Sequence, residues 1–228
     1  MPLKRSLAAL VAAASLSMTS VATPAHAADA QLDRLTSAGH SLKWNWVPQG
    51  RTERFGHAEV LIAAPLAAVR AQVTDFGHYK EFAPDKFKTA RMVAKEGPNT
   101  DVYFALPIMH GVVNLWYVTR FGPPRVASPG VEVVEGKFVR GNIKDMSIVM
   151  TMRPVDDRFT ILSCDLLVLP NVPAPQAAID EELRDAAMQA VDAIHDRAQG
   201  NKRTVPFAPA GGAVAAPAAP APAPSAAN

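Results

Sequence analysis

The sequence predicts an α+β fold in which an antiparallel sheet of seven strands packs against one long C-terminal helix. Two observations lead to this fold class. Short apolar or alternating runs recur between turn residues over most of the chain, which is typical of antiparallel strands. The stretch 173–200 instead repeats its apolar side chains at helical spacing, so it is expected to form one amphipathic helix.

The first strand is expected at 56–63, and a short helix and an aromatic loop separate it from the others. Leu66, Val69 and Val73 follow Pro65 three and four residues apart, which predicts the short helix. The remaining six strands are joined by short turns and form one antiparallel meander. They are predicted at 87–96, 100–109, 112–121, 131–140, 143–153 and 158–169.

The C-terminal helix carries one apolar stripe and charges that suit its two ends. Acidic residues at 180–182 occupy its first turns, and Arg197 and Gly200 lie near its end, as the helix dipole and C-cap preferences favour. The stripe needs an apolar partner, and one face of the meander is the only surface large enough. The stripe consists of Ile179, Leu183, Ala187, Val191 and Ile194.

The first residues have the pattern of a secretory signal peptide. Lys4 and Arg5 precede an apolar run, and the small-residue sequence 25–27 suits a cleavage site after Ala27. Serine and threonine residues interrupt the run, whereas a membrane anchor needs about 18 unbroken apolar residues. We therefore expect residues 1–27 to be removed and the mature protein to be periplasmic or secreted. Residues 28–53 are interpreted as an N-terminal extension of a domain at 54–200.

The C-terminal segment 201–228 changes composition sharply. After Thr204 it has no charged residue and proline recurs at short intervals. Such a segment cannot bury enough apolar surface to offset the entropy lost on ordering, so it is expected to be a disordered tail. Whether a protein partner recognises the tail is left open.

Charge and cysteine content exclude several functions. Signal cleavage removes two of the 23 basic residues and none of the 21 acidic ones, which leaves the mature chain with no net charge. Nucleic acid is therefore an unsuitable partner, because its binding depends on basic residues that neutralise phosphates. The single cysteine, Cys164, has no partner for an internal disulfide and is interpreted as a buried thiol.

A motif around the short helix comprises Ala64, Pro65, Val69, Asp75, Phe76, Tyr79, Phe82 and Pro84. Together with the order of elements, this motif resembles the START-like helix-grip (SRPBCC) superfamily. The resemblance covers about residues 54–199. The superfamily includes lipid-transfer domains, polyketide cyclases and coenzyme Q-binding proteins. It implies a strongly curved sheet wrapped around the C-terminal helix, with an elongated apolar cavity between them. No catalytic signature belongs to the motif.

The alternation of side chains along each strand predicts which residues line such a cavity, because residues two apart share a face. Tyr79 and Phe82 are expected over the cavity mouth, although they would equally fill the core beneath a long loop. The predicted lining residues are Val102, Phe104, Leu106, Val113, Leu115, Tyr117, Met146, Met150, Met152, Leu162 and Leu166. The row of methionines suits an adaptable apolar pocket, but it also suits an ordinary packed core.

No residue pattern predicts catalysis. No serine or cysteine lies in a nucleophile motif, and His57 with Glu59 is the nearest approach to a metal site but has no third ligand in sequence. We therefore expect no catalytic residue, metal or cofactor. The leading hypothesis is a non-catalytic carrier of an apolar small molecule or lipid, with transient membrane contact. The alternatives are a polyketide cyclase or aromatase-like enzyme and a protein-interaction domain with a filled core.

The signal-peptide hypothesis predicts that the mature chain begins at Ala28. Intact mass spectrometry of the exported protein measures this directly. A mass that includes residues 1–27 would show that the leader is retained.

Overall fold

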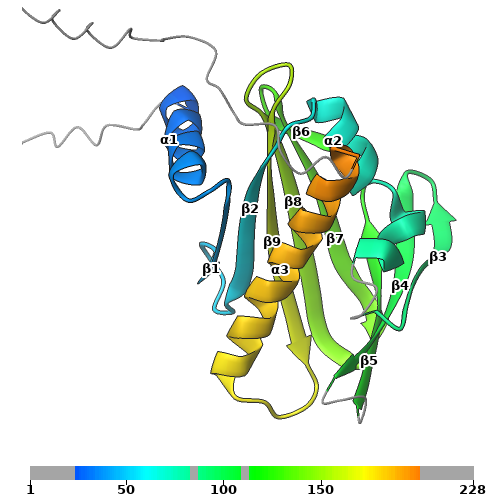
Figure 1. Cartoon of the computed structure of the whole chain (residues 1–228). Coiled ribbons are helices and arrows are strands. Elements are labelled where there is room, and N and C mark those ends of the chain that lie inside the picture. Colours follow the sequence, from blue (N-terminus) through cyan, green and yellow to red (C-terminus); the bar gives the residue numbers. More distant parts are fainter. Residues whose placement is uncertain (1–23, 83–86, 109–112, 201–228) are drawn as a thin grey trace, which may run out of the picture.

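A nine-stranded antiparallel sheet curves around the helix α3 (Gln176–Ala198) in the computed structural model (Figure 1). The structure describes residues 24–82, 87–108 and 113–200. Two shorter helical elements, α2 (Leu66–Val73) and η1 (Phe76–Phe82), lie beside the C-terminal end of α3. The predicted α+β class is confirmed. As predicted, a short helix, α2, follows the strand Phe55–Ile62, and the long helix α3 follows the last strand.

The sheet contains two more strands than the seven that the sequence predicts. The additional strands are β1, which falls in the segment set apart as an N-terminal extension, and β6, whose residues are all exposed. β1 alternates Leu42, Trp44 and Trp46 with polar residues, a strand pattern that was not assigned from the sequence, whereas β6 has only four residues, all exposed, and carries no such signal. The strands are β1 (Ser41–Trp46), β2 (Phe55–Ile62), β3 (Thr89–Glu96), β4 (Asn99–Ile108), β5 (Val113–Phe121), β6 (Arg125–Ser128), β7 (Val131–Gly141), β8 (Ile143–Pro154) and β9 (Thr160–Pro170).

The strand order is β1-β2-β9-β8-β7-β5-β4-β3, and β6 pairs with β7 outside this path. The predicted meander therefore runs from β3 to β9, and β2 joins it by pairing with the last strand. All pairs are antiparallel. The strands β2 and β9 lie next to each other although about a hundred residues separate them in sequence.

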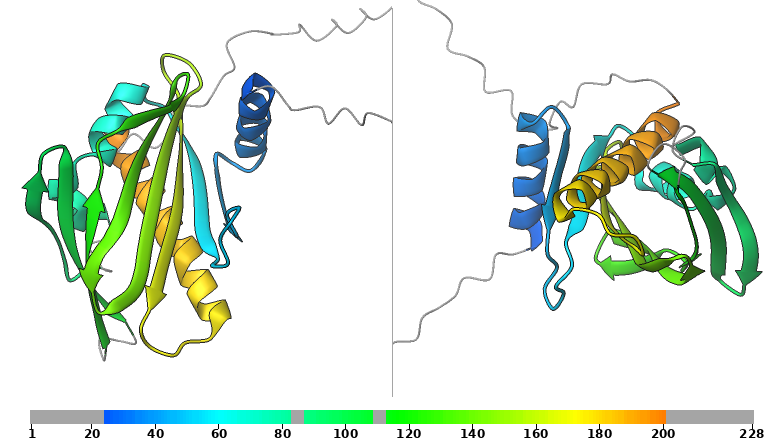
Figure 2. Two further views of the ribbon diagram at one scale, coloured as in Figure 1. Left: turned by 180° about the vertical axis from the view of Figure 1, so that it is seen from behind. Right: turned by 90° about the horizontal axis from the view of Figure 1, so that it is seen from below.

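The helix α3 lies in the concave side of the sheet (Figure 2). It begins directly after Pro175, and α2 begins directly after Pro65. Proline is tolerated at the start of a helix, because the backbone N–H that it lacks would have no partner within the helix there. Four residues of the predicted stripe are buried at 4% exposure or less, and Ile179 is partly buried. The stripe therefore faces the sheet as predicted.

A further layer lies on the convex side of the sheet, where α1 (Pro24–Ser37) covers β2 (Figure 2). Leu35 is fully buried there against Leu61, Phe159 and Ile161. The helix includes Ala27, so cleavage after that residue would remove its first turn but leave Leu35 in place. Within the described residues, no helix has the length and apolarity needed to span a membrane.

Gly56 in β2 is the point where α3 comes closest to the sheet. A methyl group at this position would overlap the backbone carbonyl of Leu183 and lie 2.6 Å from the amide nitrogen of Arg184. Only glycine leaves room for helix backbone to lie directly on strand backbone. On either side of this contact, β1 holds the helix through its inward side chains: Asn45 donates to the carbonyl of Asp180 at 2.9 Å, and Lys43 pairs with Asp185 at 2.6 Å.

We predict that Gly56→Ala lowers the free energy of unfolding by about 1–3 kcal/mol or more, because the methyl group displaces α3 from the sheet. Denaturant unfolding measures the loss. Gly122→Ala is the control, because its nearest neighbours would lie 4.0 Å away, and it should change stability by less than about 0.5 kcal/mol. Equal stability of the two variants would contradict the close approach at Gly56.

Candidate functional site

A cavity of about 640 Å³ lies between α3 and the part of the sheet that curves away from it. The helix contacts β2 and β9 closely, whereas β4 and β5 reach it only across this space. Such a volume is typical of a site for a drug-sized or lipid-like molecule. The curvature of the sheet therefore produces a space that the side chains do not fill.

The walls of the cavity are almost entirely apolar. The sheet contributes aromatic and branched side chains from β4, β5, β8 and β9, and α3 contributes part of its apolar stripe. The deep wall consists of Tyr79, Phe87, Phe104, Leu106, Leu115, Tyr117, Phe121, Met146, Ile148, Met150, Leu166, Val168, Ile179 and Leu183.

Most of the lining residues predicted from strand alternation border this cavity. They are Phe104, Leu106, Leu115, Tyr117, Met146, Met150 and Leu166. Val102, Met152 and Leu162 point to the same side but are fully buried in the close-packed core beside the cavity. Val113 begins β5, and its side chain lies outside what the structure describes. Alternation thus identifies the face of each strand but not how far along it the cavity extends.

Tyr79 and Phe82 both border the cavity, at different depths from the surface. The Tyr79 ring is 4% exposed, and its hydroxyl donates a hydrogen bond of 2.6 Å to the carbonyl of Val73. It contacts Phe76, Phe82 and Phe121, with ring centroids between 4.5 and 5.6 Å apart. Tyr79 is therefore part of the inner wall, whereas Phe82 lies between the cavity and the outer surface.

The cavity opens between the start of α3 and the end of β4. Its exposed lining residues there are Pro107, Pro173, Ala174, Ala178, Glu182, Asp185 and Ala186, which we call the rim. The rim was not predicted, because these residues come from three separate segments. The two charged rim residues, Glu182 and Asp185, are both carboxylates.

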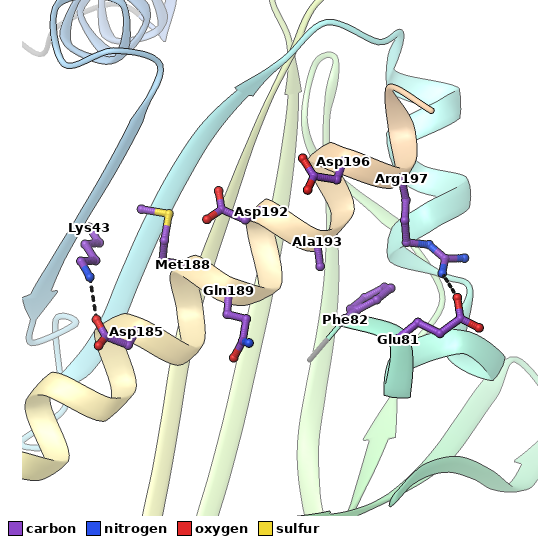
Figure 3. A pocket seen from close by; sticks show the side chains of 10 residues that line it. All are labelled: Lys43, Glu81, Phe82, Asp185, Met188, Gln189, Asp192, Ala193, Asp196 and Arg197. Atoms are coloured by element: carbon purple, nitrogen blue, oxygen red, sulfur yellow. Dashed lines mark hydrogen bonds and ion pairs between the residues drawn. The ribbon is translucent and has the colours of Figure 1, made fainter. Parts of the chain in front are cut away.

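A shallow groove of about 600 Å³ follows the outer face of α3 and adjoins the cavity (Figure 3). Phe82, Asp185 and Gln189 border both spaces. Figure 3 shows Phe82 projecting from η1 towards the helix, beside the ion pair of Arg197 with Glu81. The groove therefore meets the cavity at Phe82.

Arg197, near the end of α3, fixes the position of η1. It donates hydrogen bonds to Glu81 at 2.6 Å, to Asp75 at 2.8 Å and to Gln72 at 2.9 Å. Its guanidinium group also lies 5.6 Å from the centre of the Phe82 ring. The predicted C-terminal charge of the helix thus holds the aromatic segment against the cavity.

Cys164 does not have the character of a nucleophile. The residue is fully buried, and burial raises the pKa of its thiol well above the usual range. The sequence-based interpretation of a buried thiol agrees with this position. In the described part of the chain, no group of three or more histidine, cysteine, aspartate or glutamate side chains is arranged to hold a metal ion.

His57 and Glu59 belong to a buried polar cluster on the convex side of the sheet, away from the cavity. The His57 ring donates to Asp165 at 2.6 Å and to Glu59 at 3.1 Å, and Arg34 of α1 pairs with Glu59 at 2.9 Å. The Trp44 ring lies over the imidazole with centroids 4.2 Å apart. Asp165 could not be identified from the sequence as the partner of His57, because β2 and β9 are distant in sequence.

The cluster keeps His57 positively charged. Burial lowers the pKa of His57, but the hydrogen bonds to Asp165 and Glu59 outweigh burial and raise the pKa from 6.5 to about 9. Burial raises the pKa of Glu59, and the hydrogen bonds from His57 and Arg34 outweigh it, so the pKa lies below its usual range. The cluster is a paired set of charges that fastens α1 and β1 to the sheet.

The arrangement of sheet, helix and cavity is that of the START-like helix-grip fold. The chain is similar to a STAR-related lipid transfer protein from Xanthomonas axonopodis, with 15% identity, a TM-score of 0.59, and coverage of 70% of this chain and 94% of that one. Human StAR-related lipid transfer protein 5 matches with 10% identity and a TM-score of 0.55, over 77% of this chain and 96% of that one.

A START superfamily protein from Mycobacterium smegmatis also matches, with 16% identity, a TM-score of 0.51, and coverage of 71% of this chain and 99% of that one. No protein-family model and no curated protein matches the chain in sequence. At these identities the likeness establishes the fold.

We predict that the His57 cluster stabilises the protein less as pH rises. Because the folded pKa of about 9 exceeds the unfolded value of 6.5, the contribution is complete below about pH 6.5 and is lost through pH 9. Denaturant unfolding at pH 6, 8 and 10 gives the free energy of unfolding of the wild type and of the variant His57→Gln. The stability difference between the two proteins should shrink towards pH 10, and a constant difference would contradict the raised pKa.

Proposed function

We propose that the protein binds an apolar small molecule or lipid in the cavity and acts as a carrier or sensor without catalysis. The observation that carries this proposal is the cavity of about 640 Å³ with an apolar deep wall and an open rim. A ligand there gains about 25 cal/mol for each Å² of apolar surface removed from water. If water filled the cavity instead of a ligand, the apolar walls would remain exposed to solvent.

The similar structures support this proposal. Two of them are named for lipid transfer, and they share the sheet and helix that enclose the cavity here. No observation favours a polyketide cyclase or aromatase, because the carboxylates that border the described cavity lie at its exposed rim rather than in its deep wall. The interaction-domain alternative requires a filled interior, which the cavity volume argues against.

We further propose that the protein works in the periplasm or outside the cell. The proposal rests on the signal-peptide pattern at 1–27. A ligand carrier in that compartment would collect its ligand from a membrane surface or from solution. The tail at 201–228 is left without an assigned partner.

We predict that Met150→Trp weakens ligand binding at little cost in stability. Met150 borders the cavity, so a larger side chain would occupy space that a ligand uses. Titration with 1,6-diphenylhexatriene, an uncharged hydrocarbon that fluoresces in apolar sites, should show binding to the wild type and weaker binding to the variant by about tenfold, or 1.4 kcal/mol.

Met152→Trp is the matched control, because Met152 lies two residues further along β8 in close-packed core with no exposure. Overpacking there should lower the free energy of unfolding by about 1–3 kcal/mol. A wild-type protein that binds no diphenylhexatriene, together with equal destabilisation by both substitutions, would refute the carrier proposal.

A further inference from the structure

Among the buried residues of the deep wall, the polar groups are the hydroxyls of Tyr79 and Tyr117, and they differ in their partners. The amide of Gln189 also borders the cavity, but it is half-buried and lies further out, where the cavity meets the groove. Tyr79 donates to the carbonyl of Val73 at 2.6 Å, so its hydrogen bond is already made within the protein. Tyr117 forms no hydrogen bond with any described residue, although its side chain is only 5% exposed. An unpaired hydroxyl in an apolar interior is costly unless a ligand or water pairs with it.

The Tyr117 hydroxyl opens into the cavity. The residue lies in the middle of β5, on the face that borders the cavity, with its ring 5.4 Å from that of Phe104. The hydroxyl has no hydrogen bond to a described residue and is not fully enclosed by protein atoms, so it faces the space of the cavity. Burial raises the pKa of the phenol well above its usual range, so the group is uncharged and can donate or accept.

Charge at the opening of the cavity limits the ligand further. Among the described lining residues, the charged ones are Glu182 and Asp185, and none is basic. The adjoining groove adds Glu81, Asp192 and Asp196 to Asp185, with Lys43 and Arg197 as its cations. Both cations form ion pairs with these or neighbouring carboxylates. Among the described residues at the opening, an anionic head group would therefore meet carboxylates, and the cations there are already paired.

We propose that the ligand is an uncharged amphiphile whose hydroxyl or carbonyl group forms a hydrogen bond with Tyr117. This inference rests on the proposed ligand-binding function and specifies its substrate class. The hydrocarbon part of the ligand lies against the aromatic and methionine side chains of the deep wall. Tyr117 sets the orientation of the ligand, because it is the one unpaired polar group in that described wall.

The test compares the wild type with Tyr117→Phe and Tyr79→Phe, which each remove one hydroxyl. Diphenylhexatriene has no hydrogen-bonding group and reports an intact cavity, and 1-dodecanol and dodecanoate at pH 8 compete with it. Tyr117→Phe should weaken 1-dodecanol binding about three- to tenfold, as expected for one hydrogen bond, and leave diphenylhexatriene binding unchanged. Tyr79→Phe should lower the melting temperature and weaken 1-dodecanol binding less than Tyr117→Phe does, because the Tyr79 hydroxyl is already paired with the carbonyl of Val73. Dodecanoate should compete less well than 1-dodecanol with the wild type.

The outcomes separate this inference from the function on which it rests. If the wild type binds no diphenylhexatriene, the cavity does not bind apolar molecules and both proposals are wrong. If it binds the hydrocarbon but Tyr117→Phe binds 1-dodecanol as tightly as the wild type does, only the role of Tyr117 is wrong. Tighter binding of dodecanoate than of 1-dodecanol would overturn the preference for an uncharged ligand.

Discussion

The close contact between the backbone of α3 and β2 at Gly56 determines where the interior is packed and where it is hollow. The helix lies on β2 and β9 and is fastened to β1 by Lys43 and Asn45, so it follows one side of the sheet. The sheet then curves away through β8, β7 and β5 (Figure 2). A straight helix cannot remain in contact with both sides of a curved sheet, and the cavity is the space between them.

Charged side chains are absent from the described deep wall of the cavity. The buried cluster around His57 lies on the convex side, where α1 and the tryptophans of β1 cover it and each charge has an opposite partner. The ion pairs of Arg197 and Lys43 lie along the outer groove of α3 (Figure 3). Buried charges are tolerated only when they are paired, and ion pairs inside the cavity would have replaced apolar side chains of its wall. The segregation leaves a deep wall whose polar groups are two tyrosine hydroxyls.

The fold is shared with proteins that have between 10% and 16% identity to this chain. What such proteins have in common is a pattern rather than particular residues: alternating strands that curve, and a long helix with one apolar stripe. Side chains of many sizes satisfy that pattern. The fold pattern therefore does not fix the side chains that define the cavity here, such as Tyr117, Met150 and the acidic rim.

The sequence by itself determined the local structure: seven of the nine strands, both helices that flank the meander, and the side of each strand that faces inward. These follow from periodicity, which depends only on neighbouring residues. The tertiary structure alone decided the rest. Met150 and Met152 have the same alternation, yet one borders the cavity and the other is close-packed, because the path of α3 sets the end of the hollow. Likewise, Asp165 meets His57 only because β9 pairs with β2, a contact between distant segments that no local pattern encodes.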